Sequence, residues 1–319
     1  MKNNLKLQTM DLTGVFIKKI LPSFLMVMVL AMGCSDASKD KTPKSNKQGT
    51  PFTVGLIPEH NIFKQIERYE PLISYLSKKT GLNIKTKALT RYGNIIDNFV
   101  SAGLDAAFFG SFTYTLAHAK LGVEPIARPE SIDGRSTYHG LIFVRVDSGI
   151  KNAEDMKGKV FVFVDRATTA GYLLPLAYFK ENGIEDYHTF LKETYFAGAH
   201  ENAIYDVLNK KADIGAAKNT VLERLVSEDS RIRTELVFLE RSPDVPENGL
   251  AVREGIDYDV KQKLKETLLD MNKDPEGIEV LTKFGARRFI ETKNEDYISV
   301  YRFMKEAGFD LATYQYYNE

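Results

Sequence analysis

The sequence predicts an α/β fold, because strand and helix signals alternate along most of the chain. Short β-rich or apolar runs such as Phe52–Ile57 and Val160–Val164 are followed by stretches with apolar residues at helical spacing, as in Ile66–Lys79. Such alternation is typical of sheets rich in parallel strands. About 270 residues are available for this fold, enough for one large domain or for two lobes.

Each predicted element has a local signal. Helices end at glycines, for example at Gly81 after Ile66–Lys79 and at Gly103 after Tyr92–Ala102. A short turn is expected at Glu154–Met156, and the pattern from Val260 onward is mostly helical. Further strands are predicted at Leu82–Leu89, Asp105–Phe109, Tyr138–Val146, Ile214–Ala217 and Leu236–Leu239, and further helices at Phe112–Lys120, Thr169–Glu181, Ala203–Leu208 and Thr220–Val226.

The N-terminal segment has the pattern of an export signal. Lys18 and Lys19 precede the apolar run Ile20–Met32, which is shorter than the roughly 20 apolar residues that a transmembrane helix needs. A charged start, an apolar core and small residues after it are typical of a signal peptide. We therefore expect residues 1–33 to be a signal peptide that is removed.

Cys34 directly follows this segment and is the only cysteine of the chain. Gly33 and Cys34 resemble the end of a bacterial lipobox, where the signal is cut and the cysteine receives lipid; an inert thiol is the alternative. Several acyl chains would hold the protein at a membrane, since each buried methylene contributes about 0.8 kcal/mol. Residues 34–50 have almost no apolar side chains, so we expect a lipidated cysteine followed by a flexible tether.

Composition and motifs exclude several functions. Without residues 1–33 the chain has 39 basic and 42 acidic residues, which argues against nucleic acid as a partner. A single cysteine allows no intrachain disulfide and no cysteine-based zinc site. We find no phosphate loop, no GxGxxG, no HExxH and no hydrolase triad. We therefore expect a protein that is not an enzyme and that holds neither metal nor cofactor.

Four predicted strand-to-helix junctions contain hydroxyl, imidazole or amide side chains. In open α/β sheets, ligands bind beyond the carboxyl ends of the strands, where helices begin. A helix N-terminus has unpaired N–H groups and about half a positive charge, so it favours anions. The junctions are Phe108–Tyr114, Val164–Gly171, Ala197–Ala203 and Ile214–Thr220.

The junction Val164–Gly171 is the most informative of the four. Its apolar strand runs into Thr168 and Thr169, whose two hydroxyls, with the N–H groups of the helix start, can converge on one tetrahedral anion. A simple threonine cap is the alternative. Upstream, Tyr92 follows the strand predicted at Leu82–Leu89, either as a pocket phenol or as a core or surface tyrosine.

The other junctions leave two roles open for each residue. Ser111 or the nearby Thr113 can cap its helix, and Tyr114 either points a phenol into the crevice or packs as a core aromatic. His200 either donates to an oxyanion or is an ordinary polar side chain. Asn219 either caps a helix or contacts ligand.

Five stretches together resemble the phosphonate-binding proteins of bacterial ATP-driven uptake systems, a group that also includes receptors for phosphite and phosphate. The resemblance covers roughly residues 53–310, and it depends on the order and spacing of the stretches more than on any one of them. They are Glu70–Leu76, Asp105–Tyr114, Asp165–Gly171, Gly198–Asn202 and Ala212–Ala216.

The resemblance implies a periplasmic-binding-protein fold of type II, with two α/β lobes joined by two hinge crossings. Lobe 1 would contain residues 51–140 and 248–319, and lobe 2 residues 141–247, with crossings near Tyr138–Val146 and Arg241–Val252. It also implies a ligand site. Hydroxyls at a helix start match Thr168 and Thr169, pocket tyrosines match Tyr114 and Tyr92, and a histidine matches His200.

Two departures from the family pattern concern ligand choice. Ala170 stands where the family often has a further serine, which removes one hydrogen bond to the anion. Relatives that bind aminoalkyl phosphonates have acidic residues around the amine, and Glu247 is the candidate here, with Asn248 as its neutral neighbour.

We therefore predict a monomeric, membrane-anchored lipoprotein that faces the periplasm or cell exterior. It would capture a phosphonate or related phosphorus oxyanion for the permease of an ABC transporter. The alternative is a ligand-binding subunit of a signalling receptor, which needs the same site and a different partner. An enzyme acting on a phosphorylated or pyrimidine substrate is disfavoured, since no catalytic motif is present.

Overall fold

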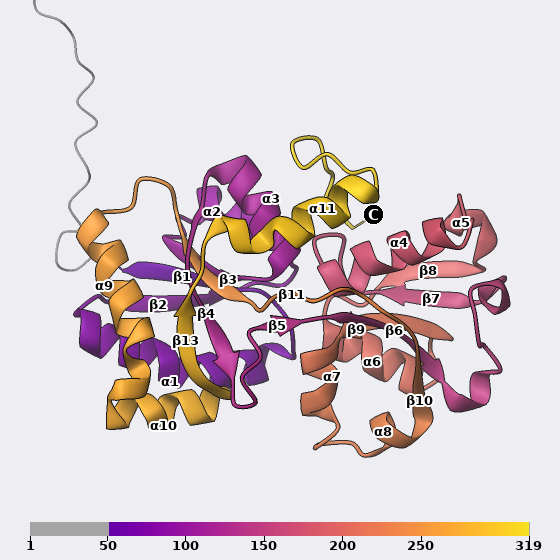
Figure 1. Cartoon of the computed structure of the whole chain (residues 1–319), viewed down its shortest axis with the longest axis horizontal. Helices are drawn as coiled ribbons and strands as arrows, with labels where there is room; N and C mark the ends of the chain where they lie inside the picture. The colour runs from indigo at the N-terminus through magenta and orange to yellow at the C-terminus, as the bar shows by residue number, and fades with distance from the viewer. Residues whose placement is uncertain (1–50, 319) are drawn as a thin grey trace, which may run out of the picture. The chain divides into compact units, whose positions relative to one another are not determined.

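Two mixed β-sheets organise the described part of the chain, residues 51–318 of a computed structural model (Figure 1). The predicted signal peptide (residues 1–33), Cys34 and the tether (residues 34–50) lie outside the described residues. No helix within residues 51–318 is long and apolar enough to cross a membrane.

The first sheet has six strands, in the order β13-β4-β12-β3-β1-β2. Strand β1 pairs in parallel with β2 and β3, whereas β12, β4 and β13 are antiparallel to their neighbours. The strands are β1 (Phe52–Leu56), β2 (Ile84–Ala88), β3 (Ala106–Phe109), β4 (Glu124–Ser131), β12 (Gly249–Val252) and β13 (Ala286–Glu291).

Helices cover both faces of this sheet, because its strands are apolar on both sides. On β3, Ala106 and Phe108 belong to one apolar cluster, and Ala107 and Phe109 belong to the other, as the two-residue period of a strand requires. The cluster of Phe108 is completed by α1 (Ile62–Thr80), α9 (Tyr258–Leu269) and α10 (Pro275–Phe284), and that of Phe109 by α2 (Asn94–Ser101) and α3 (Ser111–Leu121).

The second sheet has five strands, in the order β10-β6-β9-β7-β8, and repeats the arrangement of the first. Its strand β7 pairs in parallel with β8 and β9, while β6 and β10 are antiparallel. The strands are β6 (Gly140–Arg145), β7 (Val160–Phe163), β8 (Glu193–Phe196), β9 (Ile214–Lys218) and β10 (Leu236–Arg241), and the helices are α4 (Leu174–Glu181), α5 (Tyr187–Phe190), α6 (His200–Leu208), α7 (Asn219–Leu225) and α8 (Arg231–Glu235).

A two-stranded ribbon connects the two sheets. The chain leaves the first sheet after β4, passes through β5 (Thr137–Tyr138) and enters the second at β6; it returns from β10 through β11 (Val245–Pro246) to β12. β5 and β11 pair antiparallel, with Val245 opposite Tyr138. The α/β fold with two lobes and two hinge crossings is therefore confirmed (Figure 1).

Several elements differ from the predictions. The strand predicted at Tyr138–Val146 is divided into β5 and β6, and the helix predicted at Thr169–Glu181 begins as a π-helix, η3 (Thr169–Leu173). The sheets are mixed, because both crossings insert antiparallel strands. The strands β4, β8, β12 and β13 were not predicted. The sequence of β4 contains two prolines, which argue against a strand inside a sheet.

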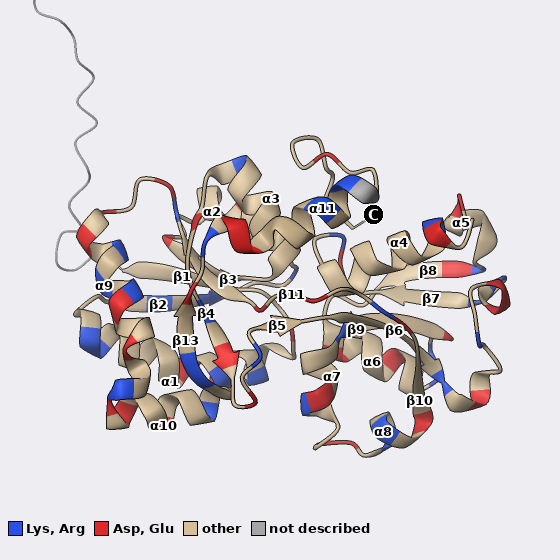
Figure 2. Cartoon of the chain, viewed as in Figure 1, with Lys and Arg blue, Asp and Glu red and all other residues tan. Residues whose placement is uncertain are grey.

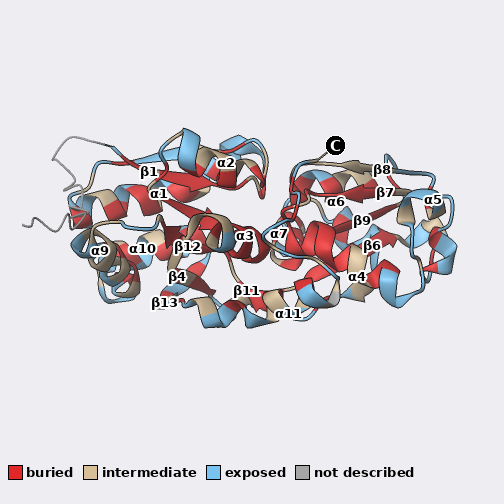
Figure 3. Cartoon of the chain, turned by 90° about the horizontal axis from the view of Figure 1, so that it is seen from above, coloured by how far each residue is buried: buried red, intermediate tan, exposed pale blue. Residues whose placement is uncertain are grey.

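The last described segment lies against both lobes. Helix α11 (Ile298–Glu306) packs against α3 and η3. Beyond it, the Tyr314 hydroxyl donates to the carbonyl of Arg166 (2.7 Å), and the Asn318 amide donates to Asp165 (3.0 Å). Figure 3 shows buried residues concentrated along the strands and on the inward sides of the helices.

Candidate functional site

One small cavity lies where the carboxyl ends of six parallel strands converge. Each of these strands ends with, or is soon followed by, a residue that lines the cavity, and the two crossings add one residue each. This is the position at which α/β sheets bind ligands. The contributions are Glu59 after β1, Tyr92 after β2, Gly110–Thr113 after β3, Thr168 and Thr169 after β7, His200 after β8, Lys218 at the end of β9, Tyr138 from β5 and Asn248 after β11.

The cavity is enclosed and polar. Its volume is about 10 Å³, close to what one water-sized sphere occupies. The side chains of Thr168, Thr169, His200, Lys218 and Asn248 are all at most 5% exposed. A ligand therefore enters only when the lobes separate, and a compact ligand suits the space.

Helix starts surround this cavity. The helices α3, η3, α6 and α7 all begin at its edge, and none has a hydrogen bond from a capping side chain. By contrast, aspartates cap α9 and α10, on the far side of lobe 1. Uncapped starts leave N–H groups and the positive ends of helix dipoles available to an anion.

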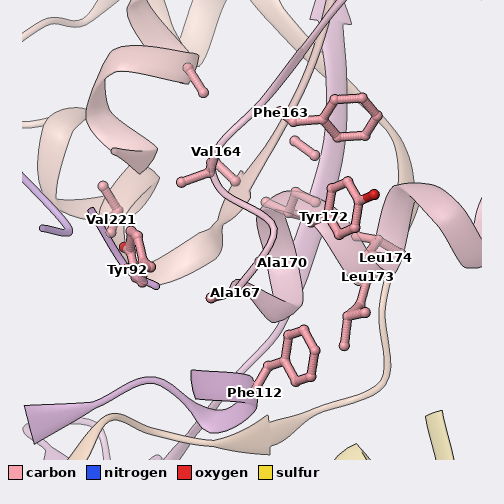
Figure 4. Packing of buried hydrophobic residues seen from close by; sticks show 14 of the residues in the cluster. Tyr92, Phe112, Phe163, Val164, Ala167, Ala170, Tyr172, Leu173, Leu174 and Val221 are labelled. Carbon is pink, nitrogen blue, oxygen red and sulfur yellow. The ribbon is translucent and has the colours of Figure 1, made fainter. Parts of the chain in front are cut away.

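Thr168 and Thr169 lie at the turn between β7 and η3. The Thr168 hydroxyl donates to the carbonyl of Asp165 (2.6 Å), and the Thr169 hydroxyl oxygen accepts the N–H of Phe112 from the other lobe (3.2 Å). Asp165 fixes the turn by accepting the N–H of Ala167 (2.9 Å). Apolar side chains pack around this turn, as Figure 4 shows for Val164 and others of the cluster. The π-helical start is a feature often found at functional sites.

Gly171 allows η3 to approach the end of β7. A Cβ at this position would lie 2.4 Å from the side chain of Val164 and 2.9 Å from the Thr168 hydroxyl. We expect Gly171→Ala to lower the free energy of unfolding by about 1–3 kcal/mol, as overpacked cores do, and to weaken ligand binding by displacing Thr168. Urea unfolding measures the first effect and ligand titration the second.

The matched control is Gly110→Ala, where the added Cβ meets its nearest atom at 3.5 Å. This change is expected to cost less than Gly171→Ala in unfolding free energy. Equal stability of the two variants would show that the close approach at Gly171 is not required.

His200 is a neutral donor in this site. Burial lowers its pKa to about 3, so the ring is uncharged at neutral pH. The N–H of Lys218 donates to Nδ1 (3.3 Å), which leaves the proton on Nε2. The ring also contacts Tyr92 edge to face, with 5.7 Å between centroids.

Two buried donors at this cavity have no partner within the described residues. They are the hydroxyl of Tyr92 and the side-chain amide nitrogen of Asn248. Burial raises the pKa of the Tyr92 hydroxyl well above its usual value, so the hydroxyl keeps its proton and donates. An unpaired buried polar group costs about 1–3 kcal/mol, so these atoms favour an acceptor that the bound molecule supplies.

Lys218 forms one wall of the cavity together with three acceptors from two segments. Its ammonium donates to Glu59 (2.8 Å), to Asn248 Oδ1 (3.0 Å) and to Glu247, and lies 4.3 Å from the centroid of the Tyr138 ring. Burial acts to lower the Lys218 pKa, but the charges of Glu247 and Glu59 raise it. The pKa of Glu59 is lowered well below its usual value although burial opposes this, since Lys218 and two arginines attract its charge. The group is therefore ionised.

A second charged cluster joins the two lobes beside the cavity. Glu201 on α6 accepts from the backbone N–H of Asn61 (3.1 Å) and from Lys64 (3.1 Å), and contacts His60 Nδ1 at 3.2 Å. The bond to His60 is the main cause that lowers the pKa of Glu201 to about 2. These contacts hold the start of α1 against α6, so the described conformation is the closed one.

The structure brings most of the predicted site residues together, but not Tyr114. Tyr92, Ser111, Thr168, Thr169 and His200 line the cavity. The Tyr114 hydroxyl instead donates to Asn294 (3.0 Å), and its ring packs on Tyr297, with 4.0 Å between centroids. Ser111–Thr113 form the first turn facing the cavity, and the next residue turns toward α11 and its preceding turn. The prediction of a pocket phenol at Tyr114 is therefore corrected.

Asn219 and Glu247 also lie outside the cavity lining. Asn219 accepts the N–H of His139 (2.9 Å) and donates to Glu223 (2.9 Å), so it ties α7 to a hinge crossing. Glu247 contacts the lining residues Lys218 and Asn248, and itself lines a neighbouring cavity of about 270 Å³. Ser111 lines the cavity but donates to the carbonyl of Pro246.

Sequence reasoning missed Glu59, Lys218 and Tyr138. The junction after β1 was overlooked because the first helix was predicted from Ile66, whereas α1 begins at Ile62. Lys218 had a signal, since it is a lysine that ends the apolar strand Ile214–Lys218. Tyr138 was predicted only as the first residue of the long strand and crossing Tyr138–Val146, and not as a cavity residue.

Charge is not concentrated on either lobe. Figure 2 shows acidic and basic residues interspersed over the covering helices. Within residues 51–318, no group of three or more histidine, cysteine, aspartate or glutamate side chains is placed to hold a metal ion. The side chains that line the cavity carry hydroxyl, imidazole, amide, ammonium and carboxylate groups.

A two-lobed α/β fold that encloses such a site defines a solute-binding protein. A family model described as the periplasmic substrate-binding protein of phosphonate ABC transporters matches residues 54–297. The chain belongs to this family.

Curated and solved relatives agree with this assignment. The chain is 27% identical over 258 residues to the phosphate-import protein PhnD of Mycolicibacterium smegmatis, covering 77% of this chain and 80% of that protein. The fold is similar to a binding protein of an ABC phosphonate transporter from Pseudomonas aeruginosa (TM-score 0.76, 23% identity, 81% and 86% covered). It is also similar to PhnD1 of Prochlorococcus marinus in complex with methylphosphonate (TM-score 0.71, 20% identity, 81% and 98% covered).

Proposed function

We propose that this protein captures a small phosphorus oxyanion between its lobes and delivers it to the permease of an ABC transporter. The observation that supports this most directly is the enclosed cavity, in which two buried donors, the Tyr92 hydroxyl and the Asn248 amide, lack a partner. A tetrahedral oxyanion supplies several acceptors at once. The protein acts by binding and release, without chemical change of the ligand.

The proposed ligand contacts come from both lobes. Lobe 1 (residues 51–140 and 248–319) offers Tyr92, Asn248 and the start of α3, and lobe 2 (residues 141–247) offers Thr168, Thr169 and His200. Each hydrogen bond to a charged group contributes about 1.5–3 kcal/mol net. Four or five such bonds reach micromolar affinity or better, about −8 kcal/mol, after the cost of association.

Calorimetric titration with phosphate, phosphite, methylphosphonate and sulfate tests this proposal. We expect at least one of the three phosphorus anions to bind at micromolar or lower concentration, and more tightly than sulfate. Absence of binding for all the phosphorus anions would overturn the proposal.

We further propose that Cys34, in a segment outside the described residues, is lipidated and tethers the monomeric protein to a membrane after removal of residues 1–33. The position of Cys34 directly after an apolar run supports this. Cys34→Ala is expected to move the protein from the membrane fraction to the soluble fraction or to block its processing. Membrane fractionation and gel migration measure both. A variant that fractionates and migrates like the wild type would refute the tether.

A further inference from the structure

Lys218 is placed at an anion site, yet its ammonium has no donor left for an anion. Three protons on Nζ match three acceptors: Glu59 Oε1, Asn248 Oδ1 and Glu247 Oε1. The side chain is 2% exposed and held inside the wall. Lys218 therefore differs from a phosphate-binding lysine, which needs a free N–H directed at the ligand.

The surroundings of Nζ are those of a site for an alkylammonium ion. Two carboxylates and an amide oxygen accept from it, and the face of Tyr138 lies 4.3 Å away, within the range of a cation–π contact. Glu59, at 2% exposure, is too deeply buried to remain charged without a cation. Lys218, at the end of β9, is the nearest cation to Glu59 at 2.8 Å, and Arg68 contacts the same carboxylate at 3.4 Å.

The same atoms border the space left for ligand. Glu59, Tyr138, Lys218 and Asn248 all line the cavity of about 10 Å³, together with Thr168, Thr169 and His200. A molecule held at those donors by its phosphorus oxygens would direct any substituent on phosphorus toward the remaining lining. A substituent that reaches Lys218 meets its ammonium group. This group repels an ammonium group on the ligand and already occupies the space beside the carboxylates.

We propose that Lys218 occupies an internal ammonium subsite and thereby restricts the ligand to phosphorus oxyanions with no substituent or a very small apolar one, excluding aminoalkyl phosphonates. This inference rests on the proposed function and specifies its ligand class. Phosphate, phosphite and methylphosphonate fit the restriction. 2-Aminoethylphosphonate does not, because its amine would compete with Lys218 for Glu59 and Glu247.

The test compares the wild type with Lys218→Ala and Lys218→Met by calorimetric titration with these four anions. We expect the wild type to bind its best small anion at least a hundredfold more tightly than 2-aminoethylphosphonate. Lys218→Ala vacates the subsite and leaves its carboxylates, so 2-aminoethylphosphonate should gain at least tenfold in affinity relative to the small anion. Lys218→Met is the matched control, since it keeps most of the volume and should show no such gain.

Lys218→Ala leaves the buried carboxylate of Glu59 with only its longer contacts to Arg68 (3.4 Å) and Arg224 (3.9 Å), so it is expected to be less stable. If the single variant does not fold, the double variant Lys218→Ala, Glu247→Gln replaces it in the test. The double variant keeps the carboxylate of Glu59 and has one negative charge fewer than the single variant. Methylammonium should raise the melting temperature of the alanine variant more than that of the wild type, because it can enter the vacated subsite.

The outcomes separate the two proposals. If none of the four anions binds the wild type, the proposed function fails. If a small anion binds but 2-aminoethylphosphonate binds the wild type equally well, only the role of Lys218 is overturned. It is also overturned if the alanine variants keep the wild-type preference.

Discussion

Replacing both Thr168 and Thr169 by valine is expected to weaken binding of the phosphorus oxyanion at least tenfold. Valine preserves the shape of threonine but removes the hydroxyl, so the double variant loses the Thr169 hydroxyl and the Thr168 hydroxyl, which donates to a ligand only after it leaves the Asp165 carbonyl. A tenfold loss corresponds to about 1.4 kcal/mol, the lower end for one hydrogen bond to a charged group. Calorimetric titration measures the affinity, and urea unfolding without ligand measures the stability.

The free protein is also expected to lose stability, by about 1 kcal/mol for each hydrogen bond that is removed. These are the bond from Thr168 to the Asp165 carbonyl and the contacts of Thr169 with the Phe112 N–H and the Tyr138 side chain. Thr115→Val is the control, because its buried hydroxyl donates within α3 to Phe112 and does not line the cavity. A double variant with reduced stability but unchanged affinity would show that the threonines only cap the helix.

Acidification from pH 7 to pH 4.5 is expected to cost the free protein about 2.5 kcal/mol through His200 alone. The pKa of His200 is about 3 in the folded protein and near 6.5 in the unfolded chain. Between these values the unfolded state binds the additional proton, so stability rises with pH; below pH 3 both states are protonated and the loss stops. Unfolding free energies of the wild type and His200→Gln across this range isolate the contribution.

Above pH 4.5, the change of unfolding free energy with pH reports mainly on His200 and not on the carboxylates. The lowered pKa of Glu201, about 2, gives stability that is present above its unfolded value and is lost only as pH falls further. His188→Gln, at an exposed position on α5, is the control and should keep the wild-type pH slope. If His200→Gln keeps it as well, His200 is not buried as a neutral ring.

The sequence was sufficient to predict the elements whose signals are local. The apolar run Val160–Phe163 and the helix start at Thr169 were predicted from their own residues, and they form the centre of the site. Tyr92, Thr168, Thr169 and His200 were placed correctly at strand-to-helix junctions because the edge where parallel strands end is fixed by chain direction.

The remaining features depend on partners distant in sequence. Tyr114 lies in the same helical turn as cavity residues, and only its contacts with Tyr297 and Asn294 show that it points away from the cavity. The role of Lys218 arises from Glu59, 159 residues away, and from the crossing at Glu247 and Asn248. β4 contains two prolines and is a strand only because β12 and β13 flank it.

Because six strands end at one cavity, the residues that select the ligand can change during evolution while the residues that hold the fold stay the same. The lining residues stand at or just beyond the ends of strands, so a single codon change alters one contact while the two sheets keep their register. Lys218 is the exception, since its loss removes the nearest cation from the buried carboxylate of Glu59. A lineage that changed its ligand by substituting Lys218 would therefore have to replace Glu59 or Glu247 as well, or bind a ligand that carries a positive charge.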